Sequence, residues 1–167
     1  MDTIIRKAKI EDKTAIMDII AAAIIHMDQK GIYQWDKIYP DSETICEDIL
    51  QKKLFVSVDD YAIKGIIVLN EEQAEEYEAL KWRYAFGKQL IIHRLCVDPR
   101  YQGKGIAKNL INFAENFAKS SSYEAIRLDA FTQNERACKM YEQAGYEKVG
   151  TVNFRKGKFY CYEKALN

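Results

Sequence analysis

Apolar side chains recur along this chain at two different spacings, and these spacings predict its helices and strands. Between residues 12 and 27, and again over residues 106–118, apolar residues return every three or four positions, which is typical of a helix that buries one face. Residues 54–58 and 62–69 are short apolar runs joined by a polar turn, a pattern that predicts a hairpin. In chain order the predicted elements are strand 3–8, helix 12–27, a helix that begins at Asp41 or Ser42 and carries Ile45, Ile49 and Leu50, strands 54–58, 62–69 and 90–97, helix 106–118, strand 125–131, a helix that runs through Met140 and Tyr141, and two terminal strands around a turn at Gly157.

This order of elements predicts an α/β (α+β) fold on one mixed sheet. Strand–helix–strand passages in the middle of the chain favour a parallel pair, and the hairpins on either side favour antiparallel neighbours. We therefore expect a mostly antiparallel central sheet with one parallel pair, flanked by about four helices. The length of 167 residues and the lack of any linker, repeat or low-complexity tract predict a single domain over residues 1–167.

Two segments carry more specific local predictions. Thr132 and Glu135 have the spacing of a capping box, and Gly145 is placed to end the helix that follows. Residues 70–89 fit the element order least well, since acidic residues come first and aromatic and basic residues follow. This segment is either a solvated hairpin loop with a charged face or a loop that contacts substrate.

Composition excludes several classes of function. Lys and Arg total 25 and Asp and Glu total 25, so no overall positive charge favours nucleic acid as a partner. The four cysteines are widely separated and only two histidines are present, which predicts no metal site and a reduced set of thiols. The sequence shows no cleavable leader and no apolar run long enough to span a membrane, so we expect a cytoplasmic protein.

Two glycines at a predicted helix start raise the question of a ligand. In "VDPRYQGKGIAKNLI", Gly103 and Gly105 stand where a strand turns into a helix, although glycine disfavours helices. Unpaired amides and the helix dipole at such a turn favour a phosphate, and the alternative is a tight connection without a ligand. The P-loop pattern is absent because Ile106 follows Gly105, and the dinucleotide pattern is incomplete because Lys108 takes the place of its third glycine.

The glycine turn and a second motif resemble the GNAT superfamily of N-acetyltransferases. The phosphate signature of that superfamily, Q/R-x-x-G-x-G/A, is matched by Gln102, Gly105 and Ala107, with Gly103 as a commonly added glycine. The resemblance is specific between about residues 90 and 150, and Tyr146 departs from it by standing where a Phe is usual. The second signature is matched by Asn134, Ala137, Tyr141, Gly145 and Tyr146.

The resemblance implies a particular way of binding acetyl-CoA as a co-substrate. It implies that backbone amides from Gln102 to Lys108 bind the pyrophosphate, and that the strand ending at Val97 splays from its parallel neighbour. Leu95 and Val97 would then pair with the pantetheine arm, and the Val97 amide would face the thioester oxygen and stabilise the oxyanion. The cofactor-binding residues that it implies are Leu95, Cys96, Val97, Gln102, Gly103, Lys104, Gly105, Ile106, Ala107, Lys108, Asn134 and Tyr141.

The resemblance also implies catalytic roles for two side chains. Tyr141 matches the tyrosine that protonates the leaving thiolate, and its alternative is a half-buried aromatic residue of the core. His93 resembles a histidine that deprotonates the amine in arylalkylamine acetyltransferases, and its alternatives are a structural histidine or a water chain to Glu or Asp as the base. Period two places His93 on the face of Leu95 and Val97 unless a bulge reverses the pattern. A covalent acyl-enzyme on Cys96 or Cys138 is disfavoured, since neither thiol has a neighbouring base in the sequence.

The acceptor is expected to be a primary amine of a small molecule or a peptide. The stretch "IYQWDKIYP" offers Tyr33, Trp35 and Asp36 as acceptor-binding residues, with Asp36 attracting a cationic amine, and its alternative is a hydrophobic lid over the core. Two other classes of function remain open: a CoA-binding sensor without turnover, and a dinucleotide-binding oxidoreductase. The exposed terminal strands are also compatible with a homodimer.

Overall fold

The computed structural model describes residues 3–166, and these residues group into two compact units. The first unit comprises residues 3–69 and 93–113, and the second comprises residues 70–92 and 114–166. Strand β4 (Gln89–Val97) and helix α3 (Ile106–Ser120) each contribute a part to both units. The ends of the predicted domain, residues 1, 2 and 167, lie outside the described residues, and its status as one domain stays a prediction.

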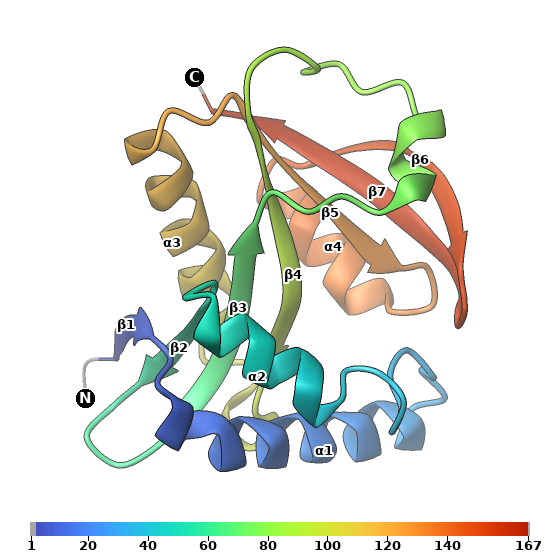
Figure 1. The fold of residues 1–167 in the computed structure, drawn as a ribbon. Helices are drawn as coiled ribbons and strands as arrows, with labels where there is room; N and C mark the ends of the chain where they lie inside the picture. Colours follow the sequence, from blue (N-terminus) through green and yellow to red (C-terminus); the bar gives the residue numbers. More distant parts are fainter. Residues whose placement is uncertain (1–2, 167) are drawn as a thin grey trace. The chain divides into compact units, whose positions relative to one another are not determined.

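The elements within residues 3–166 follow the predicted order (Figure 1). Three short 3-10 helices, η1 to η3, are the additions. The bounds are β1 (Ile4–Lys7), η1 (Ile10–Asp12), α1 (Lys13–Gln29), α2 (Ser42–Leu50), β2 (Leu54–Val58), β3 (Ile63–Asn70), η2 (Glu75–Ala79), β4, η3 (Pro99–Tyr101), α3, β5 (Ala125–Phe131), α4 (Glu135–Gln143), β6 (Glu147–Phe154) and β7 (Gly157–Ala165).

The sheet pairing confirms the predicted fold class. The hydrogen-bonded order of strands is β1-β2-β3-β4-β5-β7-β6. β1 with β2, β2 with β3, β5 with β7 and β6 with β7 are antiparallel. β4 and β5 are parallel, and their ladder joins Gln89–Ile91 to Ala125–Arg127, while β4 itself continues to Val97. The sheet is thus mostly antiparallel with one parallel pair.

Alternating side chains of β2 and β3 give the first unit two packed faces. Leu54 and Val56 of β2 and Ile66 of β3 join one buried cluster with apolar residues of α1 and α2, which explains why both helices have the period of one buried face. On the other face, the ring of Phe55 packs against Phe113 of α3 at 5.0 Å between ring centroids. Gly65 of β3 also faces α3, and a Cβ atom there would lie 3.1 Å from the Ile106 side chain, so this strand needs glycine where the helix approaches it.

Local capping explains where α2 and α4 begin and end. Asp41 caps α2 as predicted, because its carboxylate accepts from Thr44 N at 2.9 Å. The capping box predicted from Thr132 and Glu135 is wrong, since Asn134 is the cap of α4 and its side-chain oxygen accepts from Ala137 N at 3.2 Å. A cap at Thr132 would accept from the amide of Glu135, three residues later, and Asn134 instead accepts from Ala137, also three residues later. Both residue types cap helices, so the sequence offered two candidates for the start of one helix. Gly145, with φ +93°, ends α4 as predicted.

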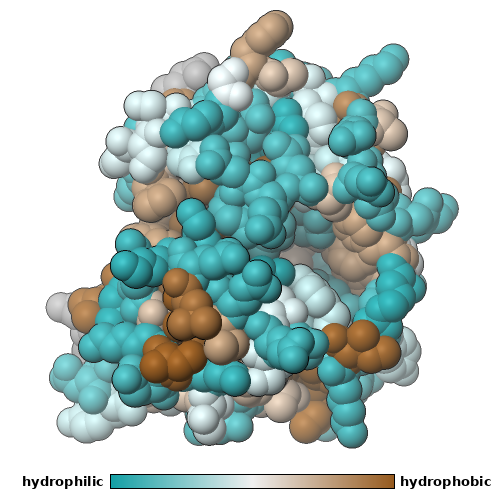
Figure 2. Space-filling view, in the orientation of Figure 1, coloured by the Kyte–Doolittle hydropathy of each residue, from teal (hydrophilic) through white to brown (hydrophobic). Residues whose placement is uncertain are grey.

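Several large apolar side chains are exposed at the surface of the described residues. The face drawn in Figure 2 is mostly hydrophilic, with hydrophobic groups scattered over it. None of the helices in residues 3–166 combines the length and apolar content that a membrane span requires. Exposed large apolar side chains include Ile4, Ile25, Ile38, Leu50, Tyr61 and Phe86.

Candidate active site

The turn between β4 and α3 has the conformation for which its glycines are suited. Gly103 and Gly105 have φ angles of +79° and +81°, in the left-handed region that glycine adopts without steric cost. A Cβ atom at either position would meet nothing within 4 Å, so backbone conformation, not crowding, requires the glycines. α3 begins directly afterwards at Ile106, and residues 103–105 are exposed. The unpaired amides and the dipole of α3 therefore favour an anion at an accessible turn.

Three cationic side chains gather beside this turn around the ring of Tyr101, and two of them are paired with carboxylates. The cationic groups of Lys64, Arg100 and Lys104 lie 5.0, 5.5 and 5.9 Å from the centre of the ring. Lys64 and Arg100 also pair with the carboxylates of Asp59 and Asp98, each at 2.8 Å. No sequence pattern pointed to Tyr101, because Lys64 reaches it from a distant strand.

The last residues of β4 point alternately toward the core and toward the opposite face of the strand. Cys96 is 6% exposed and belongs to the buried cluster of α1, α2, β2 and β3. Alternation then places the half-buried Leu95 and Val97 on the other side of the strand. Burial, with a smaller effect of Asp98, raises the pKa of the Cys96 thiol to about 12. A thiol that stays protonated is a weak nucleophile, which disfavours the acyl-enzyme alternative.

An irregular residue interrupts β4 between His93 and Leu95. Arg94 has φ +49°, and the other described non-glycine residues with positive φ, Lys52 and Ser122, lie in turns. Such a conformation costs of order 1–3 kcal/mol and persists only when the surroundings fix it. The period-two argument for the orientation of His93 does not extend across Arg94. His93 itself is half-buried, and its role as a base stays a prediction.

Tyr141 lies on the buried side of α4. Its residue is 6% exposed, and its ring centroid lies 6.0 Å from that of Tyr146 and 6.1 Å from that of Tyr162. Burial raises the pKa of the Tyr141 hydroxyl, and the charges of Asp129 and Cys138 act in the same direction. The hydroxyl therefore keeps its proton through the neutral range, which is the state that a proton donor needs.

Asp129 on β5 is a functional candidate whose environment the sequence did not reveal. The hydroxyl of the buried Tyr77, from η2, donates to Asp129 Oδ2 at 2.6 Å. Burial raises the pKa of the Asp129 carboxyl, the hydrogen bond from Tyr77 opposes this effect, and Glu76 adds to it. A carboxylate with a raised pKa is a better proton acceptor, and this one interacts electrostatically with Tyr141.

We expect Asp129→Asn to change how stability depends on pH. The pKa of the Asp129 carboxyl is higher in the folded protein than its unfolded value of about 3.9, so the protonated form favours the folded state. This stabilisation is complete below the unfolded pKa and is lost as the pH rises through the folded pKa. Asparagine carries no such charge, so the stability of the variant relative to the wild type should increase from about pH 4 to neutrality. Urea unfolding at several pH values measures the difference, and a difference that is independent of pH would contradict the assignment.

The segment 70–89 belongs to the second unit, and most of its residues are exposed, including Glu71, Glu72, Glu75, Glu76 and Glu78, which fits the prediction of a solvated loop with a charged face. Arg127 of β5 donates to Gln73 Oε1 at 2.7 Å and to the Tyr84 carbonyl at 3.1 Å, and it lies 4.2 Å from the centre of the Trp82 ring. The fully buried Glu163 of β7 accepts from Arg83 N at 2.8 Å. Side chains of distant strands thus fix this segment, and its own charge pattern carries no trace of them.

The three predicted acceptor residues have different environments in the first unit. Tyr33 is 55% exposed, whereas Trp35 is 8% exposed and joins the buried cluster. Asp36 Oδ1 accepts from the amides of Ile38 and Tyr39, at 3.0 and 3.3 Å, and so shapes the connection between α1 and α2. The burial of Trp35 fits the alternative of a lid over the core, and a direct role for Tyr33 and Asp36 stays a prediction.

A separate cavity of about 860 Å³ in the first unit is lined by none of the predicted site residues. Its walls come mainly from α1, the turn between β2 and β3, and the segment Asp98–Arg100, with Arg6 of β1, Val58 of β2 and Ile63 of β3. Within the part of the chain that the structure describes, no cluster of three or more His, Cys, Asp or Glu side chains could hold a metal ion.

Comparison with known proteins decides the family. The sequence profile described as "Acetyltransferase (GNAT) family" matches residues 20–146, which is well over half of the chain. The chain belongs to the acetyltransferase (GNAT) family. Membership places it among acyltransferases, the enzyme class that the two motifs predicted.

The relatives of this GNAT chain agree with the assignment. The crystal structure of an acetyltransferase from Staphylococcus aureus Mu50 is 30% identical, has a TM-score of 0.79, and the alignment covers 98% of this chain and 99% of that one. The N-acetyltransferase YesJ of Bacillus subtilis is 23% identical over 142 residues, or 84% of this chain and 79% of YesJ. Other matches are local: N-alpha-acetyltransferase RimI of Mycobacterium tuberculosis is 34% identical over 59 residues, or 35% of each protein. The chain spans only 16% of a Mycobacterium leprae relative.

Proposed function

We propose that this chain transfers an acetyl group from acetyl-CoA to a primary amine of a small molecule or peptide by direct attack. The observation that carries the proposal is the exposed turn at the start of α3, where Gly103 and Gly105 adopt left-handed conformations. Two proteins of similar fold support the choice of ligand. The structure of yncA from Salmonella typhimurium, with a TM-score of 0.74 and 17% identity, contains acetyl-CoA, and that of PaiA from Thermoplasma acidophilum, with 0.75 and 20%, contains CoA.

The residues of the turn fit a pyrophosphate chemically. Backbone amides between Gln102 and Lys108 would bind it, with Lys104 and Lys108 adding positive charge. Acetyl-CoA supplies the acetyl group as an activated thioester. Leu95 and Val97 lie on the side of β4 away from the core cluster, where their backbone would pair with the pantetheine arm and the Val97 amide would stabilise the oxyanion.

Proton transfer completes the proposed reaction. The amine nitrogen bonds to the acetyl carbon, the carbon–sulfur bond breaks, and Tyr141 gives its proton to the departing thiolate. The nitrogen then loses its surplus proton to water, and the Tyr141 phenolate takes a proton back from water. An alkyl ammonium with a pKa near 10.4 must first lose a proton, and His93 or the Asp129 carboxylate is the candidate acceptor. Asp129 was not among the bases expected from the sequence, and it is a candidate because burial raises the pKa of its carboxyl group. Tyr33 and Asp36 remain the proposed acceptor-binding residues, whereas the buried Trp35 would support their segment from the core cluster.

Thermal melting with ligands tests the proposal. A ligand at 100 times its Kd adds about 2.7 kcal/mol, which for a chain of this size raises the melting temperature by roughly 5–10 °C. We expect this shift with acetyl-CoA and with CoA, and none with NAD. Gly105→Glu should abolish the shift, because the side chain is strained at φ +81° and repels a pyrophosphate.

Gly31 provides a matched control for that measurement. It also has a positive φ, +73°, and a Cβ atom added there would meet nothing within 4 Å, but it lies in the turn after α1. Gly31→Glu should therefore carry similar backbone strain and keep the shift with acetyl-CoA. Wild-type protein that shows no shift with acetyl-CoA or CoA would contradict the proposal. A shift without acetylation of any amine would favour the sensor alternative.

A further inference from the structure

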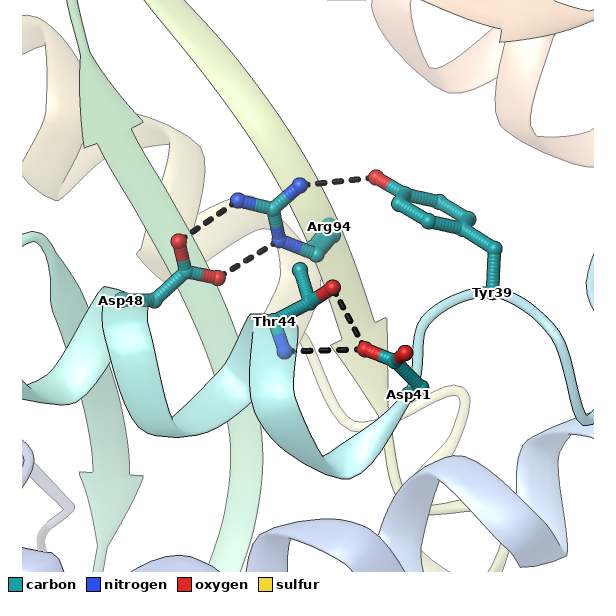
Figure 3. Close-up of polar contacts among 5 residues, drawn as sticks. All are labelled: Tyr39, Asp41, Thr44, Asp48 and Arg94. Atoms are coloured by element: carbon teal, nitrogen blue, oxygen red, sulfur yellow. Dashed lines mark hydrogen bonds and ion pairs between the residues drawn. The ribbon is translucent and has the colours of Figure 1, made fainter.

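The guanidinium group of Arg94 joins three segments of the first unit. Its Nε and Nη2 donate to the two carboxylate oxygens of Asp48 on α2, both at 2.7 Å (Figure 3). Its Nη1 donates to the hydroxyl of Tyr39, in the connection between α1 and α2, also at 2.7 Å. The side chains of Arg94 and Asp48 are each 10% exposed, so this ion pair is largely withdrawn from water. The three residues are called the Arg94 clamp below.

The clamp accounts for the unusual backbone of Arg94. A non-glycine residue at φ +49° inside a strand is strained and needs surroundings that hold it there. Two parallel hydrogen bonds between a guanidinium and a carboxylate fix both position and orientation, which a single ion pair would not do. Burial opposes the charge on Arg94, but Tyr39 and Asp48 outweigh it and raise the pKa of the guanidinium, which stays charged.

The partners of Arg94 are themselves fixed by local hydrogen bonds. Asp41 Oδ1 accepts from both the amide and the hydroxyl of Thr44, at 2.9 and 2.6 Å (Figure 3). Asp41 lies two residues after Tyr39 and caps the start of α2. On the other side, Asp36 accepts from the amide of Tyr39 at 3.3 Å. Tyr39 therefore stands between two anchored turns, and its contact with Arg94 is the point where the connection between α1 and α2 meets β4.

We propose that the Arg94 clamp is a positioning device that sets the specificity for the acceptor amine. The clamp holds residues 33–39 in a fixed position relative to residues 93–97 of β4. The first segment contains the proposed acceptor-binding side chains, and the second contains the proposed oxyanion donor. Neither Arg94 nor Asp48 need touch the substrate, since they act through Tyr39 and through the backbone of β4. The inference rests on the proposed function.

Kinetics of Tyr39→Phe tests the clamp, because this change removes one hydroxyl from a side chain that is 39% exposed. The probes are 2-phenylethylamine, spermidine and a tripeptide with a free N-terminus. For the amine that the wild type acetylates best, we expect KM to rise about threefold to tenfold, the equivalent of one hydrogen bond. The KM for acetyl-CoA and kcat should stay within about twofold, since the two hydrogen bonds from Arg94 to Asp48 remain in this variant and still hold β4.

Two further variants separate the clamp from a general loss of structure. Tyr61→Phe is the matched control, because Tyr61 is 83% exposed in the turn between β2 and β3, and its KM values should equal those of the wild type. Arg94→Gly accepts the positive φ but lacks the guanidinium. An acceptor KM that rises in Arg94→Gly supports the clamp, and a wild-type value there overturns it, as does an unchanged acceptor KM in Tyr39→Phe.

Amide hydrogen exchange gives a readout that does not depend on the acceptor. In Tyr39→Phe, exchange should become faster in residues 33–39 and stay unchanged in the body of α1. If the wild type acetylates none of the three amines, the proposed function fails. The exchange comparison then still decides whether the clamp exists, since equal exchange in residues 33–39 of both proteins would overturn it.

Discussion

Tyr141→Phe is expected to lower kcat by about 10²-fold or more, because a positioned proton donor contributes about 10²–10⁴-fold to a rate. The substitution removes only the hydroxyl from a buried ring, so the packing of α4 against Tyr146 and Tyr162 should persist. KM for acetyl-CoA should change little, since the backbone turn at residues 102–108 supplies most of the proposed binding. Thiol release at saturating acetyl-CoA, with the best of the three amine probes, measures the effect.

Tyr146→Phe is the control for this experiment, since it removes a second buried hydroxyl from the same unit. The Tyr146 hydroxyl donates to Glu115 Oε2 at 3.1 Å and has no proposed part in the reaction. Its loss should decrease stability by roughly 1–3 kcal/mol and leave kcat unchanged. Turnover in Tyr141→Phe as fast as in the wild type would remove the proton donor from the mechanism.

Asp48→Ala is expected to produce the largest loss of stability of any single substitution at a described ion pair. It leaves the charge of Arg94 buried without its bidentate partner, and breaking a buried pair in this way costs about 3–5 kcal/mol. It also removes the carboxylate that helps to hold Arg94 at φ +49°, so the backbone of β4 should relax toward extended geometry. The midpoint and slope of urea unfolding give the change in free energy.

An exposed ion pair of the same chain provides the comparison. Arg83 and Glu147 also contact each other, but their side chains are 69% and 53% exposed. Glu147→Ala should therefore change stability by less than about 1 kcal/mol, because water solvates the remaining charge. If Asp48→Ala and Glu147→Ala lowered the free energy of unfolding equally, the environment of Arg94 would not protect its charge from solvent.

Much of the fold was predictable because it depends on local periodicity. The spacing of apolar residues in 12–27 and 106–118 predicted α1 and α3 to within a few residues, and the polar turn after Val58 predicted the β2–β3 hairpin. Gly103 and Gly105 were informative for the same reason, since a positive φ is a property of the residue itself. These features can be recognised from the local sequence, without knowledge of contacts between distant residues.

Features that depend on contacts between distant residues could not be predicted in this way. Thr132 and Asn134 both have side chains that cap helices, and only the backbone that follows β5 selects Asn134. The charges of residues 70–89 predict a solvated loop, and the segment is largely exposed, but these charges do not predict that Arg127, Asp129 and Glu163 bind it from the strands β5 and β7. Buried polar partners that lie far apart in the chain leave no periodic pattern near either of them.

By itself, the sequence determined the order of elements, the parallel pair, the glycine turn and the two motifs of the GNAT family, because each is encoded within a short stretch of chain. Only the tertiary structure decided that Arg94 adopts a left-handed conformation inside β4, that Asp48 and Tyr39 hold it there, and that Tyr77 bonds to Asp129. The physical reason is that a buried charge or polar group is stable only beside its partner. Folding brings those partners together from segments whose own sequences do not show the pairing.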